Sequence, residues 1–473
     1  MSQLRNDSKR LLLDVTIASS VDDQTGIQRV VRNICQESQY AAKELGCVCV
    51  PVVCHGPHLV AVGFDGRRRW DERLFSSLVN GWMSAQYRIA KSAATFKSGA
   101  DRTYLKFLSR LRKLFLPKTP LRWLSNQYYR LTGQQIKFDD DDILVLLDAS
   151  WNLPVAELLS SAKQSGANIA TVIYDLIPVN YPQFHHESLR RIFVNWLNIV
   201  IERSDFFVGI SETVSKELAA YASQQNDHLN SKSFGHFRLG ADFLNDKCEL
   251  ENQTQSNRDE AAYHSIADKL CKGQNQLRDF YLAVGTLEPR KNHSLLLDAF
   301  DRHWNQYPGS QLLIAGKVGW MCDELIDRIN NHPQLGTSLF LLEDATDVEL
   351  SWLYRNGRAL IFPSIVEGFG LPIVEALQNG LPVIASDTPI HREVGGEHCT
   401  YFDLSSAKNL STVLSDVETS RLDLITPDNY QTSGWRESCL ELLTKIVSHF
   451  DRPEETQKDQ SANMDERKQR NAA

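Results

Sequence analysis

The segment SIVEGFGLPIVEALQNG, residues 364–380, contains two glutamates, Glu367 and Glu375, with seven residues between them. A buried carboxylate without a partner is costly, so each glutamate requires a partner in the chain or in a ligand. Carboxylates accept hydrogen bonds from hydroxyls, and two of them suit a ligand with hydroxyls on either side of a phosphate. The pair therefore predicts a nucleotide-sugar site. The alternative is that one glutamate caps a helix and the other faces water.

The residues around the glutamates indicate how they are positioned. RALIFPS reads as a strand, IVEGFG as the loop after it, and LPIVEALQNG as a helix with Pro372 in its first turn and Gly380 past its end. Gly368 and Gly370 allow the backbone to approach a ligand, and the helix N-terminus presents free N–H groups with a partial positive charge. We expect a phosphate to bind there.

Two adjacent cations, Arg290 and Lys291, lie between a predicted strand and a predicted helix in FYLAVGTLEPRKNHSLLLDAF. Arginine presents a fork of donors and lysine a point charge, so together they can neutralise a diphosphate. Taken alone, the pair is also typical of a solvated helix start. Because loops that follow the strands of one sheet converge, we expect the cations and the glutamates to share one site.

Length, charge and cysteine usage narrow the class of protein. At 473 residues the chain suits two domains of roughly 200 residues each. Its net charge of −8 gives no general attraction to nucleic acid, so no nucleic-acid partner is expected. The first residues lack the long apolar run of a secretory signal, which favours a cytoplasmic protein with reduced thiols. CVCVPVVCH alternates like a strand, which predicts core cysteines over a metal site.

Short apolar runs alternate with amphipathic stretches along most of the chain, a pattern that predicts α/β domains with parallel sheets. The alternation breaks at CELENQTQSNRDEAAYHSIADKLCKGQNQ, residues 248–276, which we interpret as a polar linker or surface segment. The expected fold class is therefore two Rossmann-like, doubly wound domains that face each other across a cleft, with function in the loops after the strands.

Several motifs occur in order: VGTLEPRKNHSLLLDAF, LYRNGRALIFPSIVEGFGLPIVEALQNGLPVIASD and HREVGGEHCTYFD. They resemble the donor-binding domain of glycosyltransferase family 4, whose members are retaining enzymes of the GT-B fold. The resemblance covers most of residues 280–402 and includes the family's signature of two glutamates with seven residues between them. The first half resembles the acceptor domain of one bacterial branch more loosely. The form GTLEPRKN is most similar to bacterial mannosyl- and rhamnosyltransferases of surface polysaccharide and O-antigen assembly.

The resemblance implies roles for individual residues. Glu367 would approach the donor sugar, Glu375 would hold the ribose hydroxyls, and Arg290 with Lys291 would bind the leaving diphosphate. The remaining donor-binding positions would be Gly285, Thr286, Gly368, Phe369, Gly370 and Leu371.

Two positions depart from the family pattern. Many members carry arginine where this chain has Thr286, so Arg290 must supply the fork from a shifted position. Many carry His-Asp where this chain has Tyr174 and Asp175. Asp175 is then a candidate contact of the acceptor or the sugar, and Gly26, in the loop after the first strand, is a second candidate on that side.

The implied activity is retaining transfer of a hexose from a nucleotide diphosphate sugar to a growing glycan, with a lipid-linked glycan favoured as acceptor. Mannose from GDP-mannose is the first expectation and rhamnose the second. The resemblance implies no metal and no cofactor. A nucleotide-sugar epimerase of the same fold and an inactive scaffold protein stay open. A dinucleotide oxidoreductase is disfavoured because SSVDDQTGIQRV lacks a G-x-G-x-x-G turn.

The expected domains are residues 1–265 on the acceptor side, 275–435 for donor binding, 436–450 as a helix that packs back on the first domain, and 451–473 as a disordered tail. Residues 101–137 carry nine cations against one acid, with leucines at helical spacing. This composition predicts either a helical insertion packed on the first domain or a helix on an anionic membrane surface. The second possibility would place the protein peripherally on the inner face of the plasma membrane.

Overall fold

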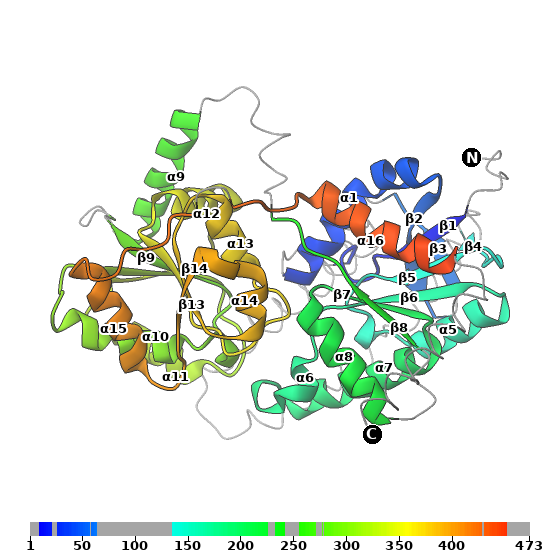
Figure 1. The fold of residues 1–473 in the computed structure, drawn as a ribbon, viewed down its shortest axis with the longest axis horizontal. Helices are drawn as coiled ribbons and strands as arrows, with labels where there is room; N and C mark the ends of the chain where they lie inside the picture. Colours follow the sequence, from blue (N-terminus) through cyan, green and yellow to red (C-terminus); the bar gives the residue numbers. More distant parts are fainter. Residues whose placement is uncertain are drawn as a thin grey trace, which may run out of the picture. The chain divides into compact units, whose positions relative to one another are not determined.

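The protein is described by a computed structural model (Figure 1). The structure describes residues 9–20, 26–56, 58–63, 135–225, 232–241, 255–270, 277, 279–427 and 430–451. Of the basic segment 101–137, only the last three residues are described, and the tail beyond Asp451 lies outside the described residues. The chain divides into two compact units, Met1–Thr171 with Arg203–Asp205, and Val172–Glu202 with Phe206–Ala473.

An eight-stranded sheet is built from the first half of the chain, in the order β4-β3-β2-β1-β5-β6-β7-β8. Its strands are β1 (Arg10–Asp14), β2 (Val48–His55), β3 (His58–Ala61), β4 (Gln135–Ile136), β5 (Ile143–Leu146), β6 (Asn168–Ile173), β7 (Phe206–Gly209) and β8 (Ser233–His236). β1 pairs in parallel with β2 and β5, whereas β3 runs antiparallel to β2 and to β4. The expected parallel sheet thus carries an antiparallel edge, because β2 and β3 are joined by a tight turn that leaves no room for a crossover helix.

The helices of this half follow its strands along the chain. Within the described residues they are α1 (Gly26–Leu45), α5 (Val155–Gln164), α6 (Ile177–Asn180), α7 (Glu187–Arg203) and α8 (Glu212–Gln225). In β2, Cys49 and Cys54 are buried, so the interpretation of these two cysteines as core residues is confirmed.

A six-stranded sheet is built from the second half, in the order β11-β10-β9-β12-β13-β14. Each of these strands runs parallel to its neighbours in the sheet. Its strands are β9 (Phe280–Val284), β10 (Gln311–Ala315), β11 (Leu339–Leu342), β12 (Ala359–Phe362), β13 (Val383–Ser386) and β14 (Cys399–Phe402). The order reverses between β9 and β12, the place where doubly wound sheets bind ligands beyond the strand ends.

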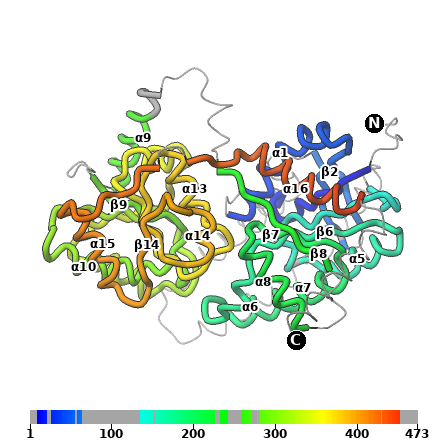
Figure 2. Tube along the Cα trace, in the orientation of Figure 1, coloured from blue at the N-terminus to red at the C-terminus, as the bar shows by residue number. Residues whose placement is uncertain are grey.

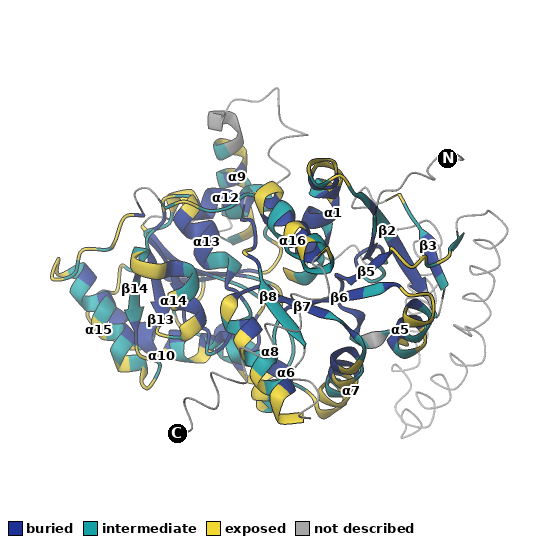
Figure 3. Cartoon of the chain, turned by 45° about the vertical axis from the view of Figure 1, so that its right-hand side comes forward, coloured by how far each residue is buried: buried dark blue, intermediate teal, exposed yellow. Residues whose placement is uncertain are grey.

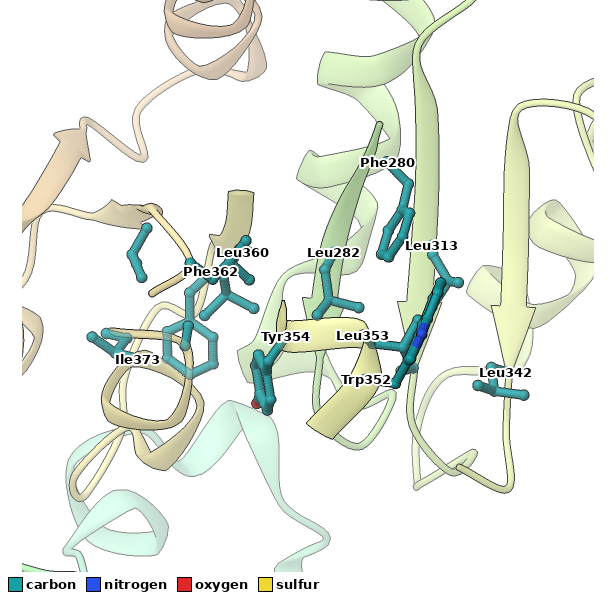
Figure 4. Close-up of a cluster of buried hydrophobic side chains, with 14 of the residues drawn as sticks. Phe280, Leu282, Leu313, Leu342, Trp352, Leu353, Tyr354, Leu360, Phe362 and Ile373 are labelled. Atoms are coloured by element: carbon teal, nitrogen blue, oxygen red, sulfur yellow. The ribbon is translucent and has the colours of Figure 1, made fainter. Parts of the chain in front are cut away.

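Both faces of the six-stranded sheet are covered, as its continuous apolar strands predict. Alternate residues of β9 belong to different cores: Phe280 and Leu282 to one, Tyr281 and Ala283 to the other. Figure 4 shows the first core, where Phe280 and Leu282 lie with side chains from β10 and α12. Figure 3 shows the strands as mainly buried and the helices as exposed on their outer faces. The covering helices are α10 (His293–Trp304), α11 (Asp323–Asn330), α12 (Asp347–Asn356), α13 (Leu371–Gln378), α14 (Pro389–Gly395) and α15 (Ala407–Glu418).

The segment expected to be a linker contains a helix, α9 (Gln255–Leu270). Ala262 and Ile266, one helical turn apart, are buried in the first core, and Lys269 Nζ lies 2.7 Å from Glu349 Oε1 on α12. The linker interpretation is therefore wrong for residues 255–270. The apolar stripe of α9 is so narrow that the polar composition around it hides the helical period.

The last helix, α16 (Trp435–Phe450), follows α15 along the trace in Figure 2. Its Ser438 hydroxyl donates to the carbonyl of Arg238 at 2.6 Å, and the His449 ring stacks on Phe206 of β7 with ring centres 4.3 Å apart. Among the helices within the described residues, none combines the length and apolar character needed to cross a membrane.

Candidate functional site

The loops after β9 and β12 bring the charged residues together. After β9 the chain runs through Gly285, whose φ is 145°, to a single turn of 3-10 helix at Pro289–Lys291. The loop after β12 contains Glu367 and ends at α13. The Ile365 N–H donates to the carbonyl of Arg290 at 2.8 Å, so a main-chain hydrogen bond joins the two loops.

Glu367 forms ion pairs with both predicted cations. Lys291 Nζ lies 2.6 Å from Glu367 Oε1, and Arg290 Nη1 donates to Glu367 Oε2. The three side chains are 10%, 18% and 8% exposed for Lys291, Arg290 and Glu367. Lys291 Nζ also lies 4.9 Å from the centre of the Phe362 ring, within range of a cation–π contact. The structure thus brings together the three residues that the sequence nominates for catalysis.

Glu288 is a further member of this cluster that the sequence analysis did not single out. Its Oε1 lies 2.7 Å from Arg290 Nη2, so Arg290 is held between two carboxylates. Its other oxygen, Oε2, is buried and has no hydrogen-bond partner within the described part of the chain. The signal in the sequence is an acid two positions before Arg290.

Burial and ion pairing oppose each other in this cluster. Burial by itself would raise the pKa of Glu367, but Arg290 and Lys291 outweigh it and lower that pKa to about 2. Burial lowers the pKa of Lys291, with Glu367 acting against the shift. Burial raises the pKa of Glu288, and Arg290 opposes it. Glu367 is therefore the carboxylate most firmly held in its charged form.

Glu375 lies apart from the ion pairs. It sits in α13 and is buried, and its Oε2 accepts a hydrogen bond from the Tyr354 hydroxyl at 2.7 Å. Tyr354 comes from α12 and is fully buried; its hydroxyl oxygen is visible in Figure 4. The two glutamates thus have separate partners, one cationic and one phenolic. Nothing in the sequence indicated Tyr354, because it stands 21 positions before Glu375 on a different helix.

The backbone between the two glutamates forms the expected glycine turn. Gly370 has a φ of 102° and precedes Leu371, the first residue of α13, with no side chain capping the helix N-terminus. Phe369 is buried. A Cβ at Gly368 would lie 3.1 Å from the carbonyl carbon of Tyr174, and nearer still to its oxygen, so only glycine fits there. Thr286 is exposed, and a Cβ at Gly319 would lie 2.7 Å from its methyl group.

Asp175 belongs to the same compact unit as the cluster and interacts with it electrostatically. Burial raises the pKa of Asp175, and Arg290 lowers it. Its Oδ1 accepts a hydrogen bond from the N–H of Ile177 at 2.9 Å. Close by in the chain, the His185 ring stacks on Trp320 with ring centres 5.7 Å apart, and its pKa is lowered by burial and then by Arg290. Gly26 lies in the other compact unit, where it begins α1 and is exposed.

Comparison with known proteins bears on this geometry. Residues 272–423 match the model of the family Glycosyl transferases group 1. This part of the chain is thus similar to the group 1 glycosyltransferases. The match contains β9 to β14 with both site loops, the same stretch in which the sequence showed its most specific motifs.

Curated relatives and solved structures extend the likeness. The chain is 29% identical over 342 residues to "Serotype-specific mannosyltransferase WbdA" of Escherichia coli, covering 68% of this chain and 40% of that protein. It is 36% identical over 132 residues to "O-antigen chain mannosyltransferase B" of Escherichia coli, covering 27% of this chain and 34% of that one. The chain thus spans well under half the length of these relatives.

Among solved structures, Anabaena Alr3699/HepE in complex with UDP matches with a TM-score of 0.52 at 12% identity, over 93% of this chain and 100% of that one. Sucrose-phosphate synthase from Thermosynechococcus elongatus matches with a TM-score of 0.52 at 16% identity, over 93% and 99%. These likenesses concern the fold, and the expected GT-B fold is confirmed.

Proposed function

We propose that this protein is a glycosyltransferase that moves a hexose from a nucleotide diphosphate sugar to a growing glycan, with retention of the anomeric configuration. The observation that carries the proposal is the convergence of Arg290, Lys291 and Glu367 where the order of a doubly wound sheet reverses. Two cations and an ionised carboxylate beside a glycine turn suit a diphosphate linked to a polyhydroxylated ring.

The proposed chemistry follows from these charges. As the bond between sugar and phosphate breaks, negative charge builds on the diphosphate, and fixed cations stabilise that charge more than they stabilise the bound donor. Arg290 and Lys291 supply the cations. Glu367 contacts the transferred sugar and Glu375 the ribose hydroxyls. The N–H groups at the start of α13, from Phe369 to Leu371, lie where the helix dipole adds to the phosphate site.

Mannose is the hexose we propose, with GDP-mannose as donor, and a lipid-linked surface glycan at the cytoplasmic face of the membrane as acceptor. The relatives whose names specify mannosyl transfer and O-antigen chains support this choice. We further propose that transfer requires no metal ion, because the cations of the site take the position that a metal would occupy beside the diphosphate.

The test is to incubate purified protein with GDP-mannose and a panel of other nucleotide sugars, with and without acceptor glycans, and to measure nucleoside diphosphate release. Release that depends on acceptor supports the transferase, and release of a rearranged nucleotide sugar without acceptor would identify an epimerase. If the protein binds a donor but reacts with none of the donors in the panel, the result would favour an inactive scaffold. NMR of the product gives the anomeric configuration, and excess EDTA tests the metal independence.

A further inference from the structure

The two cations proposed to hold the diphosphate already have anionic partners in the chain. Lys291 Nζ lies 2.6 Å from one Glu367 oxygen, and Arg290 Nη1 contacts the other. Arg290 Nη2 lies 2.7 Å from Glu288. The cations that an incoming diphosphate would bind are therefore already paired with carboxylates. The diphosphate must either share the cations with these carboxylates or displace one carboxylate.

Sharing is unfavourable on the charge balance. Arg290 interacts with three carboxylates, those of Glu367, Glu288 and Asp175, and the second cation of the cluster is Lys291. Adding a diphosphate to a buried group of charges in which carboxylates already outnumber cations is opposed by repulsion between the anions unless one of them leaves. Replacement of one carboxylate removes that repulsion.

Glu367 is the carboxylate that can leave without disturbing the loops. The loop that carries it is held by main-chain groups: the Ile365 N–H donates to the Arg290 carbonyl at 2.8 Å, and the Arg290 guanidinium donates to the Val366 carbonyl at 3.3 Å. Neither bond involves the Glu367 side chain, so its carboxylate can rotate while the backbone stays in place. Glu288, in contrast, is paired with Arg290. Among the ion pairs of the described residues, it has none with Lys291.

We infer that the Glu367 carboxylate occupies the diphosphate's place on Arg290 and Lys291 until the donor binds, and that the incoming diphosphate displaces it toward the transferred sugar. The inference rests on the proposed function for the identity of the anion, a nucleoside diphosphate. Exchange keeps the cations paired at every stage. It also makes the carboxylate available to sugar hydroxyls only when the diphosphate is bound, which couples sugar recognition to diphosphate recognition.

The test is calorimetric titration with inorganic pyrophosphate, and in parallel with GDP, of wild-type protein and two variants. Glu367→Gln keeps the shape but removes the competing anion, so pyrophosphate should bind roughly tenfold or more tightly, the size of losing one charged hydrogen-bond competitor. Glu288→Gln removes the same charge while leaving Glu367 on both cations, so its tightening should be several-fold smaller. Weaker or unchanged binding by Glu367→Gln, or equal tightening by both variants, would overturn the inference.

A second measurement covers the case in which Glu367→Gln fails to fold. In Glu367→Ala, acetate can enter the vacated place, so at constant ionic strength added acetate should weaken pyrophosphate binding in this variant and leave wild-type binding unchanged. Acetate without any effect on the variant contradicts displacement. Both measurements require binding alone. If they succeed while no nucleotide sugar reacts, the proposed function fails and the exchange of anions stands.

Discussion

The substitution Gly316→Ala, directly after β10, tests whether close main-chain packing holds the loop that carries Arg290 and Lys291 in one position. A Cβ at Gly316 would lie 2.6 Å from the carbonyl carbon of Gly285 and closer still to its oxygen. Unstrained carbon–carbon contacts need about 3.5 Å or more, so Gly316→Ala requires the loop after β9 to move by roughly 1 Å. Backbone atoms have no rotamer by which to avoid the clash.

Two magnitudes follow for Gly316→Ala. Overpacking of this kind costs about 1–3 kcal/mol of unfolding free energy. A displacement of roughly 1 Å in a catalytic group can cost about 10²-fold in turnover. We therefore expect a lower midpoint in urea denaturation and a fall in kcat/KM for nucleoside diphosphate release of about two orders of magnitude, measured well below the unfolding transition.

Gly309 provides the matched control for the same substitution. It lies in a surface turn of the same domain before β10, a Cβ added there meets nothing within 4 Å, and its φ is not positive. Gly309→Ala should leave activity unchanged and stability equal or slightly raised. The reasoning is refuted if the two alanine variants have the same unfolding free energy, or if Gly316→Ala keeps wild-type turnover.

Three further expectations concern the site and the start of α10. Arg290→Ala should reduce turnover by roughly 10²-fold, the scale of losing one preorganised donor. Arg290→Lys should restore turnover only in part, because lysine lacks the fork of donors. Near-normal turnover in Arg290→Ala would show that Arg290 does not stabilise the leaving diphosphate. Glu375→Ala should raise the KM for the donor more than it lowers kcat, whereas Glu367→Ala should act mainly on kcat. Steady-state kinetics measures both, and the reverse pattern would show that the roles of the two glutamates are swapped. Burial, and to a lesser extent Lys291, lowers the pKa of His293 to about 3. The unfolded chain therefore protonates His293 more readily than the folded chain does. The contribution of His293 to stability falls as pH drops from about 6.5 toward 3. In urea titrations between pH 7 and 4, the free energy of unfolding should fall less steeply with pH for His293→Gln than for wild type. Equal slopes of unfolding free energy against pH would contradict this expectation.

The sequence predicted the parts of the site that depend on local pattern. Each strand of the six-stranded sheet is a short, nearly continuous apolar run, and such runs are interpretable because both faces of a parallel sheet are buried. The residues that follow β9 and β12 were then identified as site loops, since the carboxyl ends of parallel strands lie at one edge of their sheet. Arg290 and Glu367 could be nominated together on that ground alone.

Local pattern was weaker where polar residues dominate. The composition of α9 predicts a linker because only a narrow stripe of its residues is apolar. Its helical state depends on packing against α12 and on Lys269 pairing with Glu349. The antiparallel edge of the first sheet was also missed. Apolar alternation in β2 and β3 is the same whichever direction a partner strand runs.

Only the tertiary structure decided which groups pair. Arg290 and Glu367 are 77 positions apart, and Tyr354 and Glu375 lie on different helices. The sequence supplies the charges and the loops that carry them, because those follow from residue type and from periods of two and 3.6 residues. Whether a cation meets a carboxylate, a phosphate or water depends on distances of a few ångströms, and these are set when strand order, loop length and side-chain packing act together.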